Sequence, residues 1–193
     1  MYEDFYEMSA TPFTRGLPSE ALYMPPELTE VENRLKYVAK RQLFAVLTGD
    51  CGTGKTTILR KFRDNLDPGQ YRFLYISDSK LTPRNFYRIL LEQLGFTPKY
   101  NRGDAKRQLH EEIEIMKAVH GLQPVCVCDE CHLMSREMLE EIRFLLNTHL
   151  DSKSPMGLVL TGQTELWRKL QLQAYEAIID LEKCIYVLDS VGS

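Results

Sequence analysis

The sequence predicts an α/β fold in which helices cover both faces of a central parallel sheet. Three observations support this prediction. Short apolar runs alternate along the chain with longer segments whose apolar residues recur at helical spacing. These runs are nearly continuous, which is typical of strands buried on both faces of a parallel sheet. A glycine-rich segment also follows the first run directly and opens the next helix.

The order of the elements follows from these patterns. The expected strands are 43–48, 71–76, 124–128, 157–161 and 185–188. The expected helices are 27–40, 55–65, 82–95, 104–121, 135–149 and 165–179. Thr82, Asp104 and Ser135 have the side chains that cap a helix N-terminus. Residues 1–26 carry aromatic residues and prolines without a sustained period, so we expect an arm packed on the body, and a single domain over 27–193.

Composition narrows the class of protein. The 193 residues are 44% hydrophobic and 26% charged, with a net charge of −3, as in an ordinary globular protein. Any contact with nucleic acid must therefore come from a local basic patch. No apolar run approaches the roughly 20 residues that span a bilayer. The acidic start, Met1 to Asp4, does not resemble a secretory signal, so we expect a cytoplasmic protein without a membrane partner.

Residues 49–56 fit the phosphate-binding loop pattern G-x-x-x-x-G-K-[ST], between a strand and a helix as that pattern requires. Small residues let backbone N–H groups converge on phosphate oxygens. Lys55 is expected to neutralise the β- and γ-phosphates of ATP, and the Thr56 hydroxyl to bind Mg²⁺. The expected nucleotide-binding residues are Gly49, Asp50, Cys51, Gly52, Thr53, Gly54, Lys55, Thr56 and Thr57.

Two carboxylates follow the third apolar run, in the pattern known as Walker B. Asp129 is expected to hold Mg²⁺ through water, and Glu130 to orient and deprotonate the water that attacks the γ-phosphate. Alone, such a pair is more often a helix cap or a solvated turn. The phosphate-binding loop in the same chain favours the catalytic interpretation.

Polar residues also end the fourth apolar run. Gln163 or Thr161 is a candidate catalytic residue that senses the γ-phosphate from this position. The alternative is that Thr161 only ends the strand while Thr164 caps the next helix.

Cysteines cluster near the two carboxylates, at Cys126, Cys128 and Cys131, with His132 beside them. Residues of these types bind zinc. Cys126 and Cys128, however, point to the same face of a strand that helices should cover, where a free cysteine behaves as a small apolar residue. The odd total of five cysteines does not suggest a disulfide framework, and reduced thiols are the simpler interpretation.

Two basic clusters are candidate contacts to the DNA backbone. Residues 99–107 place basic side chains around Tyr100, and Arg60, Lys61 and Arg63 lie on the helix after the phosphate-binding loop. The alternative for each cluster is a solvated helix surface.

Four motifs together resemble one group of bacterial AAA ATPases, over residues 2–175. They are Phe5-Tyr6 with Pro12-Phe13, TGDCGTGKTT, CVCDECHLM and VLTGQTEL. This group includes ATP-dependent helpers of DNA transposition and the secretion-pathway A-type (ExeA-like) ATPases. The resemblance implies an AAA-type P-loop fold with strand order 5-1-4-3-2, Mg²⁺-dependent ATP hydrolysis, assembly of several copies, and double-stranded DNA and a transposase as partners.

The chain departs from the group after its last expected helix. Members of the group continue with an arginine-rich turn and a C-terminal helical lid, whereas no arginine follows Arg168 here. We therefore expect a missing lid and weakened hydrolysis, or a site that another chain completes. A regulator of transposition is the leading interpretation, because a secretion ATPase is expected to carry membrane and peptidoglycan-binding segments. The alternatives are a secretion-pathway ATPase and a nucleotide-dependent interaction module with little catalysis.

Overall fold

The computed structural model describes residues 22–78, 81–146, 154–171 and 183–188. Within these residues, five parallel strands form one sheet in the order β2-β3-β4-β1-β5. The strands are β1 (Phe44–Gly49), β2 (Tyr71–Ile76), β3 (Gln123–Cys128), β4 (Gly157–Gly162) and β5 (Lys183–Leu188). The expected strand order and all five strands are confirmed, with no strand end shifted by more than two residues.

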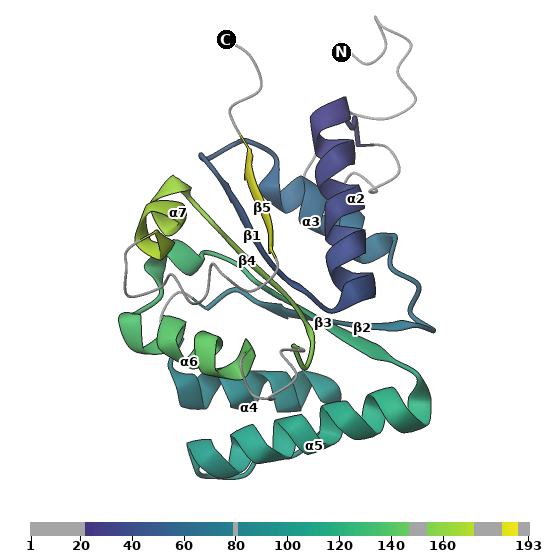
Figure 1. Ribbon diagram of the computed structural model, residues 1–193, viewed down its shortest axis with the longest axis vertical. Helices are drawn as coiled ribbons and strands as arrows, with labels where there is room; N and C mark the ends of the chain where they lie inside the picture. The colour runs from purple at the N-terminus through teal and green to yellow at the C-terminus, as the bar shows by residue number, and fades with distance from the viewer. Residues whose placement is uncertain (1–21, 79–80, 147–153, 172–182, 189–193) are drawn as a thin grey trace, which may run out of the picture.

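Helices lie on both faces of this sheet (Figure 1). The described helical elements are α2 (Pro26–Arg41), α3 (Lys55–Asp64), α4 (Pro83–Leu94), α5 (Arg102–His120), the 3-10 turn η2 (Cys131–Leu133), α6 (Arg136–Leu146) and α7 (Thr164–Leu170). Figure 1 shows α2 and α3 on one side of the sheet, and α4, α5 and α6 on the other. The three-layer α/β fold is therefore confirmed.

The strands divide their side chains between two hydrophobic clusters. Along β3, Cys126 and Cys128 face the cluster formed with α4, α5 and α6, whereas Val125 and Val127 face the cluster formed with α2 and α3. This alternation is the period of two expected of a strand. The central strands β1, β3 and β4 are buried on both faces. Polar residues from these strands therefore come together beyond the strand ends, which is where the candidate site lies.

Helix boundaries follow local chemistry with one correction. The hydroxyls of Thr82 and Ser135 accept hydrogen bonds from the backbone N–H groups of Asn85 and Met138, so both expected caps are confirmed. Asp104 is not a cap, because α5 begins earlier and Asn101 is its N-cap residue. Asp104 lies in the first turn, pairs with Arg107 and suits the positive end of the helix there.

Several expectations fall outside the described residues. They concern the arm over residues 1–21, the ends of the helices expected to reach 149 and 179, and the chain after 188. Within the described ranges, no helix is long and apolar enough to cross a membrane.

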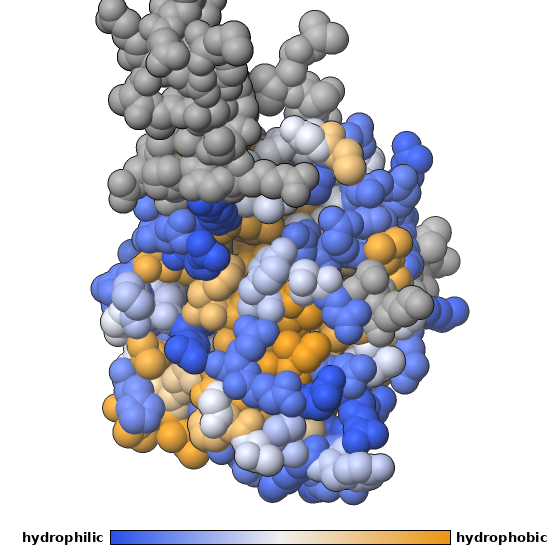
Figure 2. All heavy atoms as spheres, turned by 180° about the vertical axis from the view of Figure 1, so that it is seen from behind, coloured by the Kyte–Doolittle hydropathy of each residue, from blue (hydrophilic) through white to orange (hydrophobic). Residues whose placement is uncertain are grey.

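The back of the molecule carries mostly hydrophilic side chains around a central apolar region (Figure 2). Single exposed apolar side chains are normal in globular proteins. Large ones among the described residues are Tyr23, Tyr37, Tyr75, Tyr100, Ile115, Val119, Leu133 and Phe144. Two of these tyrosines, Tyr75 and Tyr100, bear on function below.

Candidate nucleotide-binding site

The phosphate-binding loop joins β1 to α3 at the carboxyl edge of the sheet. Gly52 and Gly54 have φ angles of +84° and +89°, a backbone region that residues with a side chain rarely adopt. A Cβ on Gly54 would also lie 3.3 Å from Leu28 Cδ1 on α2. These glycines therefore let the loop curl tightly before Lys55, the first residue of α3.

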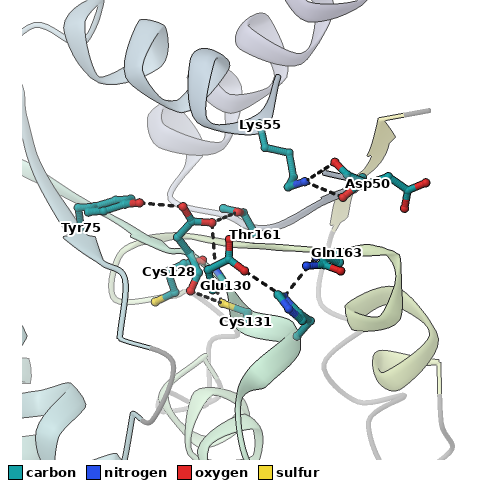
Figure 3. Close-up of polar contacts among 11 residues, drawn as sticks. Asp50, Lys55, Tyr75, Cys128, Glu130, Cys131, Thr161 and Gln163 are labelled. Atoms are coloured by element: carbon teal, nitrogen blue, oxygen red, sulfur yellow. Dashed lines mark hydrogen bonds and ion pairs between the residues drawn. The ribbon is translucent and has the colours of Figure 1, made fainter. Parts of the chain in front are cut away.

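The loop is held in shape by its own polar groups. Lys55 Nζ donates hydrogen bonds to the carbonyl oxygens of Gly49, at 2.6 Å, and Asp50, at 2.8 Å. The Thr53 hydroxyl donates to the same Asp50 carbonyl at 2.9 Å. The ammonium group thus lies across the loop that is expected to surround the phosphates, as Figure 3 shows for Lys55 and Asp50.

The first turn of α3 supplies further donors. Backbone N–H groups at the start of a helix lack partners within it and carry a partial positive charge. Thr56 is exposed and Thr57 half-buried in this turn. The Thr56 hydroxyl has no hydrogen-bond partner among the residues that the structure describes. It therefore remains available to a metal ion. Cys51, in the loop itself, is an exposed free thiol.

Asp129, directly after β3, accepts hydrogen bonds from two neighbouring strands. Tyr75 on β2 donates its hydroxyl to Asp129 Oδ2 at 2.7 Å, and Thr161 on β4 donates to Oδ1 at 2.5 Å. The Glu130 backbone N–H also donates to Oδ1, at 2.9 Å. Figure 3 shows Tyr75 and Thr161 on opposite sides of this carboxylate.

Sequence reasoning missed Tyr75. The available signal was the alternation of Tyr71, Phe73 and Tyr75, which places all three on the face of β2 that Asp129 continues on β3. A hydroxyl-bearing aromatic at the end of that row can reach the next strand. The expected strand order makes β2 and β3 neighbours, so the missing information was which side chains meet across them.

Glu130 stands beside Asp129 in a backbone conformation that is unusual for its residue type. Its φ angle is +55°, and its side chain is exposed. Glu130 Oε2 lies 3.5 Å from His132 Nδ1, which also faces the backbone N–H of Gln163 at 3.4 Å. A non-glycine residue at positive φ stores strain that tertiary contacts must hold, and such residues cluster at functional sites.

The two candidate sensor residues, Thr161 and Gln163, have different surroundings in the structure. Thr161 is buried and its hydroxyl is committed to Asp129, whereas Gln163 is half-buried at the N-cap position of α7. Thr164 is the first residue of α7 and not its N-cap, so the expectation that it caps this helix is wrong. Its hydroxyl instead donates to Asp50 Oδ1 at 2.9 Å, which ties the start of α7 to the phosphate-binding loop.

Gly162 allows β4 to approach the turn that carries Glu130. A Cβ on Gly162 would lie 3.0 Å from the backbone nitrogen of His132 and 3.3 Å from its Nδ1. A distance of 3.0 Å to a backbone atom is too short for a real Cβ to fit without a shift. The residue after Thr161 must therefore be small if the two strand ends are to keep this spacing.

The cysteine cluster packs inside the protein. Cys126, Cys128 and Cys131 are all buried, and Cys131 Sγ donates to the Cys128 carbonyl at 3.0 Å. Burial raises the pKa of Cys131, which favours its neutral thiol form. His132 points instead toward Glu130 and Gln163. In the described ranges, no three side chains of His, Cys, Asp or Glu form a metal site.

The chemistry of the remaining donors fits a nucleotide with Mg²⁺. Magnesium prefers oxygen ligands, and proteins usually bind it through one or two side chains together with substrate phosphates and water. Thr56 and Asp129 are the oxygen donors here, and Lys55 is the cation that accompanies phosphates. All three lie at the carboxyl edge of the sheet, Lys55 and Thr56 after β1 and Asp129 after β3, which agrees with this role.

Comparisons with known proteins agree with this fold. Residues 38–170 match the AAA domain family. General secretion pathway protein A of Aeromonas hydrophila is 30% identical over 175 residues, which cover 89% of this chain and 31% of that protein. The chain therefore spans about a third of the length of this relative.

Solved structures share the fold at low sequence identity. The ORC2 protein of Aeropyrum pernix, in its ADPNP–ADP complexes, has a TM-score of 0.66 at 15% identity, covering 89% of this chain and 50% of that one. For Cdc6p of Pyrobaculum aerophilum the TM-score is 0.58 at 19% identity, covering 89% and 48%. For Drosophila ORC bound to DNA it is 0.60 at 12% identity, covering 84% and 90%.

Proposed function

Because the chain belongs to the AAA domain family, we propose that it binds ATP with Mg²⁺ and hydrolyses it at the carboxyl edge of its sheet. The observation that carries this proposal is the meeting of two motifs there. The β1–α3 loop brings Lys55, while the end of β3 brings Asp129 and Glu130. Phosphoryl transfer requires both motifs, because one binds the phosphates and the other supplies the carboxylates for the metal ion and the attacking water.

Each residue has a role that its chemistry supports. Lys55 exchanges its two carbonyl partners for oxygens of the β- and γ-phosphates. Thr56 and Asp129 hold the metal ion, which when bound neutralises charge on the phosphates. Gln163 is the N-cap residue of α7 and is the proposed sensor of the γ-phosphate. Thr161 acts indirectly, because its hydroxyl is bonded to Asp129.

Glu130 is the proposed general base. Its exposed carboxylate takes a proton from a water molecule as the water oxygen bonds to the γ-phosphorus. The bond from that phosphorus to the bridging oxygen breaks, and ADP leaves with the electron pair. Water therefore supplies the oxygen and the proton, and the products are ADP and phosphate.

The test is ATP hydrolysis by the wild type, Glu130→Gln and Lys55→Ala. Glu130→Gln should bind ATP normally and turn over about 10²- to 10⁴-fold more slowly, the usual contribution of a general base. Lys55→Ala should lose nucleotide binding. Glu111→Gln and Lys40→Ala, at exposed positions on α5 and α2, are matched controls that should behave as wild type.

Two other outcomes have definite meanings. If ATP raises the melting temperature while turnover in Glu130→Gln equals that of the wild type, the chain is a nucleotide-dependent interaction module. If ATP neither stabilises the protein nor is hydrolysed, the proposal fails.

We also propose a DNA-associated role, as in the transposition helpers, carried out in the cytoplasm by several copies of the chain. The supporting observation is Tyr100, which is 79% exposed, with the Arg84 guanidinium 4.3 Å from the centre of its ring. An exposed aromatic ring beside cations suits nucleic acid. The basic surplus there is smaller than the sequence suggests, because Arg102 and Lys106 pair with Glu141, and Arg107 with Asp104.

Gel shifts with duplex DNA and ATP over a salt series test this role. Binding should weaken steeply with salt and fall in an Arg84→Gln, Tyr100→Ala double variant, but not in Arg34→Gln on α2. Absence of any shift at low salt would remove the DNA role together with a transposase partner. A secretion-pathway role would then lead, which the similarity to General secretion pathway protein A supports equally well.

A further inference from the structure

Tyr75 occupies a special place at the edge of the sheet. It lies near the end of β2, the outermost strand on its side, and shares a face with Tyr71 and Phe73. Those two pack against the cluster beneath α2 and α3. Tyr75 is 40% exposed, and its hydroxyl reaches across to Asp129 on the neighbouring strand. Its ring therefore spans the distance between an edge strand and the carboxylate of the site.

The hydroxyl contact completes a set of three donors around Asp129. Thr161 and the Glu130 backbone N–H both donate to Oδ1, whereas Tyr75 is the donor to Oδ2 among the described residues. Without it, the carboxylate keeps a fixed Oδ1 but gains freedom to rotate about that point. Hydrogen-bond partners of a metal ligand set its orientation, and their loss commonly weakens metal binding.

Gln93 on α4 fixes the backbone of Tyr75. Its Nε2 donates to the Tyr75 carbonyl at 2.8 Å, and its Oε1 accepts from the Tyr75 N–H at 3.0 Å. The Gln93 carbonyl in turn accepts from Arg72 at 2.7 Å. A side-chain amide thereby takes the place that a further strand would occupy beside this edge. Gln93 thus fixes the Tyr75 backbone from outside the sheet, and the Tyr75 hydroxyl in turn fixes Asp129 at the end of the neighbouring strand.

We propose that Tyr75 is a positioning residue that aims Asp129 at the metal ion, and that Gln93 acts on the site through Tyr75. This inference rests on the proposed Mg²⁺–ATP site. Neither residue touches the nucleotide in this account. The edge strand β2, together with Gln93 from the adjacent helix α4, therefore sets how tightly the metal ion is bound.

Tyr75→Phe removes only the hydroxyl. Tyr71→Phe makes the same change on the same face of the same strand and is the matched control. The expected result for Tyr75→Phe is about a tenfold rise in the Mg²⁺ concentration that half-saturates ATP-dependent thermal stabilisation, as for other partners of metal ligands. ATP binding in EDTA should stay unchanged. Tyr71→Phe should match the wild type in both measurements.

A second variant tests the route through Gln93. Gln93→Leu should raise the half-saturating Mg²⁺ concentration less than Tyr75→Phe, and the double variant should equal Tyr75→Phe alone, because the two act in series. Additive effects would overturn the Gln93 part. An unchanged Mg²⁺ response in Tyr75→Phe would overturn the whole inference while leaving the ATP site intact. If the wild type itself shows no Mg²⁺ response, it is the proposed function that fails.

Discussion

Two carboxylates of this protein each accept a hydrogen bond from a tyrosine, but their surroundings differ in charge. Tyr75 donates to Asp129 at 2.7 Å, and Tyr87 donates to Glu141 at 2.5 Å. Glu141, only 3% exposed, also pairs with Lys106 at 3.2 Å and Arg102 at 3.4 Å. Among the described residues, no lysine, arginine or histidine pairs with Asp129.

The difference separates a structural carboxylate from one available to a ligand. Burial alone would raise the pKa of Glu141, but the Tyr87 hydrogen bond and the charge of Lys106 together lower it below its usual value. Glu141 is therefore a charged brace that joins α4, α5 and α6. Asp129 has neutral donors only, so its charge remains for a cation that arrives with the nucleotide.

The largest expected effect is that of Asp129→Asn. Removing the charge should slow ATP hydrolysis at least about 100-fold, because the metal loses its carboxylate. The free energy of unfolding without nucleotide should change by less than about 1 kcal/mol, since no ion pair is broken. Turnover assays and urea unfolding check both. A stability loss as large as that of Glu141→Ala would contradict the comparison.

Glu141→Ala should have the reverse profile. We expect a loss of about 2–3 kcal/mol in the free energy of unfolding, because the Tyr87 hydroxyl and the Lys106 ammonium lose their shared acceptor. Turnover of the folded protein should remain within about twofold of the wild type, since no group of the brace reaches the site. Glu137→Ala, exposed on the same helix, is the control for losing a glutamate.

Gly162→Ala tests the spacing behind the catalytic turn. The added Cβ would meet the His132 backbone 3.0 Å away, so the turn carrying Glu130 must shift. We expect about a tenfold fall in kcat with nucleotide affinity retained, since small displacements of a catalytic group are costly. Gly103→Ala, where an added Cβ meets nothing within 4 Å, is the matched control. Equal behaviour of the two variants would refute the role of this contact.

The smallest effect concerns pH. The pKa of Glu141 is lowered in the folded state, so its stabilisation is present above the pKa of the unfolded chain, about 4.3, and is lost as pH falls through the folded value. The difference in unfolding free energy between wild type and Glu141→Gln should be constant from about pH 7 to 5.5 and shrink in more acidic solution. A difference that grows on acidification would reverse the sign and contradict the assignment.

The sequence was sufficient for the parts of the site that depend on local spacing. The loop at 49–56 and the pair Asp129–Glu130 each lie within a few residues of an apolar strand, so chain position alone locates them. The strand order came from a resemblance, and the structure confirms it. The motifs also predicted the family correctly. They do not distinguish a DNA-associated role from a secretion role, because both kinds of protein in the group share them.

Contacts between residues that are distant in the sequence could not be predicted from it. Tyr75 and Asp129 are separated by 54 positions, and Asp50 and Thr164 by 114. Their pairing depends on which strands are neighbours and on side-chain reach, neither of which leaves a local pattern. The Glu141 brace was missed for the same reason, since its partners lie on two other helices. The start of α5 was misplaced because Asp104 has capping chemistry and the actual N-cap, Asn101, makes no side-chain cap.

The most direct test of the central claim is calorimetric titration of ATP into the wild type and Asp129→Asn, each with Mg²⁺ and with EDTA. We predict that Mg²⁺ tightens binding of ATP to the wild type about tenfold or more, and that the variant binds with similar affinity in both buffers. Equal dependence on Mg²⁺ in the two proteins would show that the Asp129 carboxylate does not bind a metal ion, and would contradict the account.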